Sequence, residues 1–391
     1  MSPPQKVSGN PRFTRCYLEN WKNFRKADVP LERRTFVVGP NAAGKSNFLD
    51  AFRFLADISR SGGGFQAAVE RRTSVSAIRN LSARRYPEIV LRVAIGTSEC
   101  PEVWTYELSF TQNNNRIPQI TSERVAHFGT EILSRPLEVD RADVERLTQT
   151  HLEQVNANKS FREIADFLSN VRYLHVVPQL IREPDRSVGR RNDPYGGDFL
   201  EQLARTPKRT LDSRLERIRR ALQIAVPQLA QLELERDESG NPHLKGRYAH
   251  WRPNGGWQSE DQFSDGTLRL IGFLWSMLDG NGPLLLEEPE LSLNAGVVRR
   301  LPELIYRMQR KNDRQVILST HAGDMFIDSG VGAHEVLVVT PSPDGSQVRV
   351  GASIPEVERV LAASDTLSEA IMPLTVPPNV YELPLFADLK P

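Results

Sequence analysis

Short apolar runs alternate with amphipathic stretches along much of the chain, which predicts a fold that combines strands and helices. Residues 36–38 form one apolar run, and residues 47–55 after it repeat apolar side chains at helical spacing. The alternation returns later, where apolar runs at residues 284–286 and 316–318 flank a helical pattern at residues 297–308. Because strands separated by amphipathic helices are typical of an α/β core, we expect an α/β fold.

A second pattern, with polar turns between its apolar runs, predicts an antiparallel β subdomain in the first third of the chain. Residues 13–18 and 27–31 form two short strand candidates before the first apolar run. Residues 89–95, 103–110 and 119–128 form three more. We therefore expect a mixed central sheet with flanking helices and an antiparallel sheet beside it.

The middle of the chain is predicted to hold an inserted helical lobe. Residues 141–168 carry apolar side chains at helical spacing, and residues 171–177 form a candidate buried strand that ends near Gln179. Residues 182–191 are basic, and the helix predicted at residues 211–224 carries further arginines. The other elements expected here are a helix at residues 199–204 and a hairpin of strands at residues 231–236 and 243–251.

Composition narrows the class of protein. The 391 residues include 39% hydrophobic and 25% charged side chains, the balance of a globular protein with a sizeable core. The net charge of +1 gives no overall attraction to nucleic acid or to an acidic membrane, so such a contact needs a local patch. With two cysteines, no Cys/His cluster and no apolar run near the ~20 residues of a membrane span, we expect a cytoplasmic protein without structural zinc or a membrane partner.

The strongest chemical signal is the sequence GPNAAGKS at residues 39–46, which fits G-x-x-x-x-G-K-[ST] between a strand and a helix. Gly39 and Gly44 permit a tight turn whose backbone N–H groups point inward at phosphate oxygens. The start of the following helix adds partial positive charge. Lys45 is expected to reach the β- and γ-phosphates, and the Ser46 hydroxyl is expected to ligate Mg²⁺. The sequence therefore predicts a P-loop.

Two carboxylates end a second apolar strand, where residues 284–286 run into Glu287 and Glu288. We expect this strand beside the P-loop strand, with successive side chains pointing in different directions. Glu287 is assigned to Mg²⁺, directly or through water, and Glu288 to the attacking water. His321 follows the apolar run at residues 316–318 and is a candidate donor to the γ-phosphate. Solvated acids and a surface histidine are the alternative, which the P-loop disfavours.

A third candidate is the start of the helix predicted at residues 263–278. Ser264 is a natural N-cap, and the N–H groups that follow it, including that of Gly266, are free to bind an anion. A simple capped helix explains the same residues, so this motif is weak when taken alone.

Together, these motifs resemble the ABC-type ATPase heads of the SMC/RecF/OLD group, often labelled AAA-type ATP-binding proteins. In the family's order, the corresponding segments are Walker A at residues 39–46, the signature at 264–267, Walker B at 284–288, the D-loop at 289–294 and the switch histidine His321. Residues 21–24 are similar to the asparagine–aromatic signature of the first hairpin. Asp265, Thr267, Glu287 and Asn294 depart from the commonest residues of such heads and point to RecF/OLD-like heads rather than to transporters.

The resemblance implies a P-loop NTPase of ABC-ATPase type that binds ATP with Mg²⁺. The expected catalytic residues are Glu288, His321 and Lys45, and the expected Mg²⁺ ligands are Ser46 and Glu287. Two glutamines are candidates for the Q-loop, and Gln179, near the expected lobe junction, is favoured over Gln66. The expected nucleotide contacts are Gly39, Pro40, Asn41, Ala42, Ala43, Gly44, Lys45, Ser46, Asn47, Gln179, Ser264 and Gly266.

One Walker A and one signature in the chain imply a head-to-tail homodimer with two ATP molecules at its interface. The function this implies is an ATP-dependent dimer switch in DNA repair, DNA maintenance or phage defence. The alternative is a scaffold or sensor with slow or no hydrolysis that controls a separate effector such as a nuclease. Glu288 and His321 favour the switch. The residues after His321 lack the acidic motifs of a Toprim nuclease domain, so no nuclease is expected in this chain.

Two basic segments, residues 182–191 and 208–220, are candidates for contact with DNA phosphates. The alternative is a solvated helix face whose arginines pair with Asp212 and Glu216.

The domains expected are 12–130 and 226–345 as the two parts of the ATPase lobe, 131–225 as the helical lobe and 346–391 as a tail.

Overall fold

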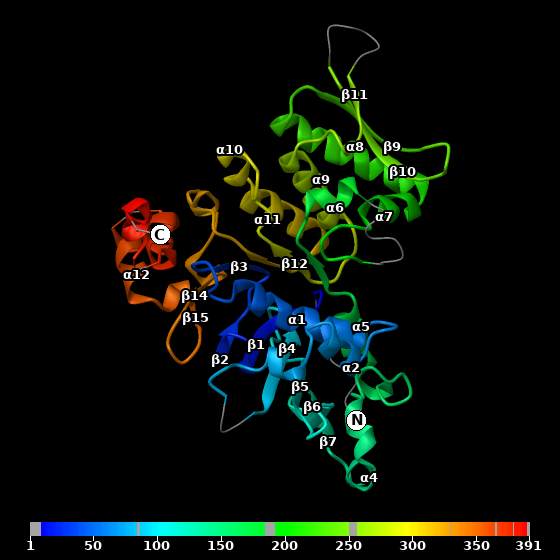
Figure 1. Ribbon diagram of the computed structural model, residues 1–391, viewed down its shortest axis with the longest axis vertical. Helices are drawn as coiled ribbons and strands as arrows, with labels where there is room; N and C mark the ends of the chain where they lie inside the picture. Colours follow the sequence, from blue (N-terminus) through cyan, green and yellow to red (C-terminus); the bar gives the residue numbers. More distant parts are fainter. Residues whose placement is uncertain are drawn as a thin grey trace.

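The computed structural model describes residues 9–83, 87–183, 192–249, 256–328, 330–363, 366–377 and 379–388. A central sheet has an antiparallel sheet and helix α1 on one side and a group of helices on the other (Figure 1). This arrangement confirms the expected α/β fold with a mixed central sheet and an antiparallel β subdomain. In the described part of the chain, no helix has the length and apolar character needed to cross a membrane.

The central sheet has six strands in the order β15-β14-β3-β13-β12-β8, and all neighbours are parallel except β14 and β15. The expectation that the strand of Glu287 lies beside the P-loop strand is wrong, because β13 pairs with both and separates them. All four residues of β13 are buried, as a strand paired on both edges requires. The strands are β3 (Arg34–Val38), β8 (Arg172–Leu174), β12 (Leu284–Glu287), β13 (Val316–Ser319), β14 (Val336–Thr340) and β15 (Gln347–Val350).

The second six-stranded sheet is antiparallel throughout, in the order β2-β1-β4-β5-β6-β7. Each of the five strands predicted for this region is present. The strands are β1 (Arg12–Trp21), β2 (Phe24–Pro30), β4 (Ile89–Gly96), β5 (Trp104–Gln112), β6 (Pro118–His127) and β7 (Thr130–Arg135). The predicted strands form because their alternating apolar residues face one buried side.

Helix α1 (Lys45–Ser59) lies between the two sheets and shares a core with both. Phe48 and Phe52 are fully buried, and Phe52 packs against Phe13 of β1. Burial of each such ring contributes about 1.5–3 kcal/mol. Val37 belongs to this core while Phe36 belongs to the core on the other face of the central sheet. The P-loop strand is therefore buried on both faces, which holds the loop at its end in a fixed position.

The other face of the central sheet is covered by helices that also carry a small three-stranded sheet of order β11-β10-β9. These elements confirm the helices and the hairpin predicted there, although residues 250–251 of the hairpin lie outside the described residues. The helices are α6 (Pro178–Arg182), α7 (Phe199–Arg205), α8 (Lys208–Ala225), α9 (Asp265–Leu278), α10 (Ala295–Val298) and α11 (Leu301–Asn312), and the strands are β9 (Leu229–Arg236), β10 (Pro242–Tyr248) and β11 (Trp257–Gln258).

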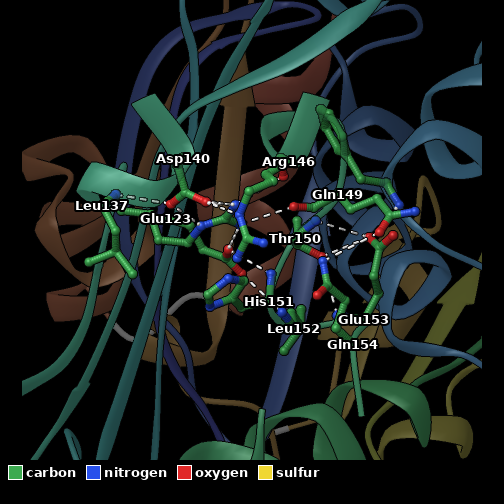
Figure 2. Close-up of polar contacts among 12 residues, drawn as sticks. Glu123, Leu137, Asp140, Arg146, Gln149, Thr150, His151, Leu152, Glu153 and Gln154 are labelled. Atoms are coloured by element: carbon green, nitrogen blue, oxygen red, sulfur yellow. Dashed lines mark hydrogen bonds and ion pairs between the residues drawn. The ribbon is translucent and has the colours of Figure 1, made fainter. Parts of the chain in front are cut away.

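The long helix predicted at residues 141–168 is wrong except at its end. The structure has α4 (Glu138–Ala142), two short 3₁₀ turns with irregular backbone between them, and then α5 (Arg162–Ser169). The cause is a group of buried polar contacts, the Arg135 cluster, formed by Glu123, Arg135, Asp140 and the backbone of residues 146–152 (Figure 2).

Arg135 donates to the carbonyls of Arg146 and Gln149 at 2.9 and 3.0 Å, and Glu123 accepts from the N–H groups of His151 and Leu152 at 2.8 and 3.0 Å. These backbone groups would otherwise pair within a helix, so the buried charges replace the helix.

The residues predicted as a single helical lobe are distributed over the molecule. Segment 136–170 packs beside α1 and the antiparallel sheet, β8 joins the central sheet, and α6 to α8 lie on its other side (Figure 1). The remaining helices are α2 (Phe65–Glu70), α3 (Val75–Ile78), α12 (Pro355–Ala362) and α13 (Leu367–Ile371). The segment expected as a tail, residues 346–391, contains β15, α12 and α13.

Candidate nucleotide-binding site

The P-loop backbone has the curled shape that a phosphate requires. Ala42 and Gly44 have positive φ angles of 61° and 107°, so consecutive N–H groups turn toward the concave side of the loop. At Gly39, an added Cβ would lie 2.3 Å from the carbonyl oxygen of Val339, so β14 leaves no room for a side chain. Gly44 precedes α1, and the free N–H groups of that helix N-terminus open into the same loop.

A polar brace holds this loop from behind. Asn23, in the turn between β1 and β2, donates to the carbonyl of Ala42 at 3.3 Å and accepts from the side-chain amide of Asn47. Ser346, between β14 and β15, donates its hydroxyl to the carbonyl of Ala43 at 2.6 Å and its N–H to the carbonyl of Asn23 at 2.7 Å. The residues likened to the family's first-hairpin signature therefore support the loop directly.

Lys45 and Ser46 are held in different environments. Lys45 is buried, and its ammonium donates to the carbonyls of Gly39 and Pro40 at 3.0 Å each. Burial lowers the pKa of Lys45, while the charges of Glu288 and Glu287 oppose that shift. Two carbonyls are weak partners for a buried cation, so the ammonium is ready to bind an anion in the loop.

Ser46 is exposed, and its hydroxyl donates to Glu287 Oε1. A hydroxyl and a carboxylate oxygen in contact match the oxygen donors that Mg²⁺ prefers. The described residues contain no cluster of three or more His, Cys, Asp or Glu side chains able to hold a metal. Phosphate and water oxygens would therefore have to complete the coordination of Mg²⁺ at Ser46 and Glu287, as they do in most magnesium sites of this kind.

Glu287 has two neighbours on the β8 segment that sequence reasoning missed. The Tyr173 hydroxyl donates to Glu287 Oε2, and His175 Nδ1 lies 3.2 Å from the carbonyl oxygen of Glu287. Burial raises the pKa of Glu287, and the hydrogen bond from Ser46 opposes that rise. The run of residues 171–177 predicted a strand, but nothing in it indicated that the strand pairs with β12.

Glu288 contacts a different side chain from those that contact Glu287. Its φ of 44° lies in the left-handed region, which costs a non-glycine residue about 1 kcal/mol or more. This turn brings Glu288 Oε1 to 3.1 Å from His321 Nε2. The hydrogen bond from His321 lowers the pKa of Glu288, so the carboxylate is charged at neutral pH. The structure therefore brings together two of the predicted catalytic side chains.

A third carboxylate, Glu290, was not singled out in the sequence. It is buried and accepts from the Thr320 hydroxyl at 2.6 Å and from the backbone N–H of His321 at 3.0 Å, both at Oε1. Its other oxygen, Oε2, is buried and has no hydrogen-bond partner among the described residues. Glu290 thus holds the backbone next to the histidine that contacts Glu288.

The signature residues cap helix α9. The Ser264 hydroxyl accepts from the N–H of Thr267 at 3.2 Å. An added Cβ at Gly266 would lie 2.4 Å from the carbonyl of Ser292, so the D-loop backbone packs directly on the signature. Arg182 of α6 donates to Asp265 at 2.7 Å. Among the described residues, no hydrogen bond joins Ser264 or Gly266 to the P-loop of the same chain.

The structure places Gln179 on α6, where its side chain is exposed and has no hydrogen bond within the described part of the chain. Gln66 lies on α2 and donates to the carbonyls of Pro118 and Thr148 at 2.9 Å, so it links these two backbone segments. The assignment of Gln179 to the Q-loop stays a prediction.

Three arginines of α8 have local carboxylate partners. Arg219 and Arg220 both pair with Glu216 at 2.7 Å, and Arg214 pairs with Asp279 at 2.9 Å while it lies over Trp275. These ion pairs agree with the solvated-face alternative for Glu216. Residues 184–191 of the other basic segment lie outside the described residues.

The fold and the site together define an ABC-type ATPase head of the SMC, RecF and OLD group. Residues 34–322, more than half of the chain, match the family described as "AAA domain, putative AbiEii toxin, Type IV TA system", and the chain belongs to that family. The match spans the P-loop strand, the signature, both carboxylates and the switch histidine, which confirms the predicted resemblance.

Two curated proteins are similar to short stretches of the chain. Endonuclease GajA of Bacillus cereus (strain VD045) is 39% identical over 46 residues, which are 12% of this chain and 8% of that protein. Structural maintenance of chromosomes protein 1 of Schizosaccharomyces pombe (strain 972 / ATCC 24843) is 40% identical over 52 residues, 13% of this chain and 4% of that protein. The chain thus spans less than a tenth of the length of either relative.

Among solved structures, an SMC head bound to the C-terminal winged-helix domain of ScpA has a TM-score of 0.51 and 15% identity. The likeness covers 86% of this chain and 96% of that chain. At this identity it shows the shared fold.

Proposed function

We propose that the chain binds and hydrolyses ATP at the P-loop and that ATP joins two copies head to tail. The observation that carries the proposal is the meeting of three strand ends at one loop. Ser46 follows β3, Glu287 is the last residue of β12, and Glu288 and His321 follow β12 and β13. All four lie at the same edge of the central sheet. Ligands bind at the carboxyl ends of parallel strands in folds of this kind.

Each side chain then has a role that follows from its position. The N–H groups of residues 42–46 and the Lys45 ammonium bind the phosphates of ATP. Mg²⁺, held by Ser46 and Glu287, would neutralise charge on the phosphate oxygens. Glu288 is charged, and its second oxygen is available to orient and accept a proton from the attacking water. His321 holds the Glu288 carboxylate and is the candidate donor to the γ-phosphate.

The dimer follows from the signature helix. α9 has 14 residues, and its cap uses only the N–H of Thr267, which leaves earlier N–H groups for an anion. Because Ser264 makes no hydrogen bond to the P-loop of its own chain in the described residues, a second copy is the natural source of that anion. The phosphates bound at one P-loop would thus be covered by the partner's α9.

The second candidate function is an ATP-held scaffold with slow or absent hydrolysis that controls a separate effector. The charged Glu288 with its His321 partner favours hydrolysis. Measuring turnover beside oligomeric state for the wild type separates the two, because a scaffold dimerises with ATP but turns it over slowly. Endonuclease and chromosome-maintenance relatives support a role in DNA maintenance, but the proposal assigns no DNA contact to α8, where Arg214, Arg219 and Arg220 already pair with carboxylates.

The test removes one charge from the site. Glu288→Gln keeps the size of the side chain, so ATP should still bind, whereas hydrolysis should fall by roughly 10²–10⁴-fold because the water loses its base. The closed dimer should then accumulate, as measured by light scattering with ATP and Mg²⁺. Glu303→Gln, at an exposed position of α11, is the matched control.

A second change tests the partner surface. Ser264→Arg, added to Glu288→Gln, should return the protein to monomers while ATP still binds. If Glu288→Gln hydrolyses ATP at the wild-type rate, the assignment of Glu288 is wrong. If the double variant still dimerises with ATP, the signature helix is not the surface that meets the second copy.

A further inference from the structure

Arg269 is a charged side chain of the site that no motif assigned. It lies on α9, five positions after Ser264, and lines a narrow crevice with Glu287, Glu288 and Pro289 at the end of β12. The helix that would contact the partner's nucleotide therefore carries an arginine that faces the carboxylates of its own chain.

The guanidinium of Arg269 is incompletely paired. Its Nε is buried and has no acceptor among the described residues, and no ion pair within them involves this side chain. Burial lowers the pKa of Arg269, while the charges of Asp265, Glu288 and Glu290 oppose that shift. A buried donor without a partner costs about 1–3 kcal/mol, so a rearrangement that supplies an acceptor is favourable.

Glu290 has an acceptor oxygen that lacks a donor among the described residues. Its Oε1 accepts two hydrogen bonds from the Thr320–His321 segment, but its Oε2 is buried and unpaired among the described residues. Glu288 is the other nearby carboxylate, and it already pairs with His321. A donor on α9 and an acceptor on the turn after β12 thus both lack a partner among the described residues, and the charge of Glu290 opposes the lowering of the Arg269 pKa.

We propose that Arg269 and Glu290 form a salt bridge when α9 closes on nucleotide, and that Arg269 is a positioning residue for hydrolysis. The inference rests on the proposed function. The bridge would connect α9 through Glu290 to the backbone of His321, and His321 holds Glu288. The hydrolytic carboxylate would then be aligned only when the signature helix is in its closed position.

The test is a double-mutant cycle on the full chain with Arg269→Gln, Glu290→Gln and the double variant. Each single variant should lower kcat for ATP hydrolysis at least about tenfold with KM changed less than about twofold, because the pair aligns Glu288 without touching nucleotide. The double variant should be no slower than the slower single, since each removes the same bridge. Arg269→Lys should restore part of kcat. Arg217→Gln, an exposed arginine of α8, is the control.

The closed dimer supplies a readout that does not need turnover. In the Glu288→Gln background, Arg269→Gln and Glu290→Gln should each weaken ATP-dependent dimerisation by a similar factor, without a further loss when combined. If Arg269→Gln has the kcat of the wild type, the inference is wrong and the proposed function stands. The same holds if the decreases in kcat of the two single variants multiply in the double variant. A wild-type protein that neither hydrolyses ATP nor dimerises with it would overturn both the proposed function and this inference.

Discussion

The Arg135 cluster and the nucleotide site both bury charged side chains, but they do so in opposite ways. Arg135 makes five hydrogen bonds, one for each N–H of a guanidinium, to Glu123, Asp140 and two backbone carbonyls. At the nucleotide site, the partners of Lys45 within the described residues are carbonyls alone, and Arg269 and Glu290 each have a buried polar atom without a hydrogen-bond partner there.

The difference separates structural charge from functional charge. A completed network needs nothing further and holds the chain in one conformation. An incomplete one has a free-energy cost that a ligand or a conformational change can remove, and such groups gather at functional sites. Changes in the Arg135 cluster should therefore act mainly on stability, whereas changes at the nucleotide site should act mainly on binding and turnover.

The largest effect is expected at Arg135. Arg135→Leu leaves Glu123 and Asp140 buried without their partner, so the free energy of unfolding should fall by about 3–5 kcal/mol. Urea unfolding followed by circular dichroism measures this change. Arg92→Leu, an exposed arginine on β4 of the same sheet, should lose less than about 1 kcal/mol. Nearly equal losses of unfolding free energy in the two variants would show that the Arg135 cluster has no special structural role.

The second-largest effect is expected at Lys45, on the affinity for ATP. Lys45→Ala should weaken ATP binding roughly 100-fold, because a charge-assisted contact to phosphate is worth up to about 3 kcal/mol. Its free energy of unfolding should stay close to that of the wild type, since the buried ammonium has only two carbonyl partners. Fluorescent-nucleotide titration measures the affinity, with Lys311→Ala on the exposed face of α11 as control. A folded Lys45→Ala protein with unchanged affinity would contradict the site.

The smallest effect is a pH dependence at His151, beside the Arg135 cluster. Burial lowers the pKa of His151 to about 4, with Arg135 and Arg146 adding to the shift and Asp140 opposing it. The unfolded chain then binds more protons than the folded one between pH 6.5 and about 4, so stability falls as pH falls. His151 should account for about 2 kcal/mol of the loss between pH 7 and pH 5.

Removal of the imidazole tests this sign. His151→Gln should flatten the fall in stability between pH 7 and pH 5, measured by urea unfolding at each pH. His243 is a matched control of opposite sign, because its hydrogen bond to Glu260 raises its pKa, so its contribution is present at low pH and lost as pH rises through the folded value. An unchanged slope in His151→Gln would show that this histidine is not titrating as described.

The sequence was sufficient where function and fold depend on local pattern. The P-loop, the strand before it and the two carboxylates of β12 each lie within one short segment, so spacing alone predicted them. The sequence placed Glu288 and His321 just after two buried strands, but it did not predict the contact between their side chains.

The failures share a different cause, which is contact between distant segments. The helix expected at residues 141–168 is replaced by backbone bound to Glu123 and Arg135, residues that precede it and carry no helix-breaking signal. Tyr173 reaches Glu287 only because β8 pairs with β12, and the position of β13 between β3 and β12 depends on the order of strands. The spacing of apolar residues predicts strands but not which strands are neighbours, so these features could not be predicted from the sequence.

The brace behind the P-loop has a consequence for synthesis of the chain. Asn23 and Ser346 both contact the P-loop backbone. Asn23 lies in the turn between β1 and β2, whereas Ser346 lies in the turn between β14 and β15, far along the sequence. A nascent chain that has left the ribosome only as far as the switch histidine therefore has every residue that would touch nucleotide but lacks half of the brace. The loop conformation of the folded chain therefore depends on β14 and β15, which are synthesised after the residues of the candidate nucleotide site.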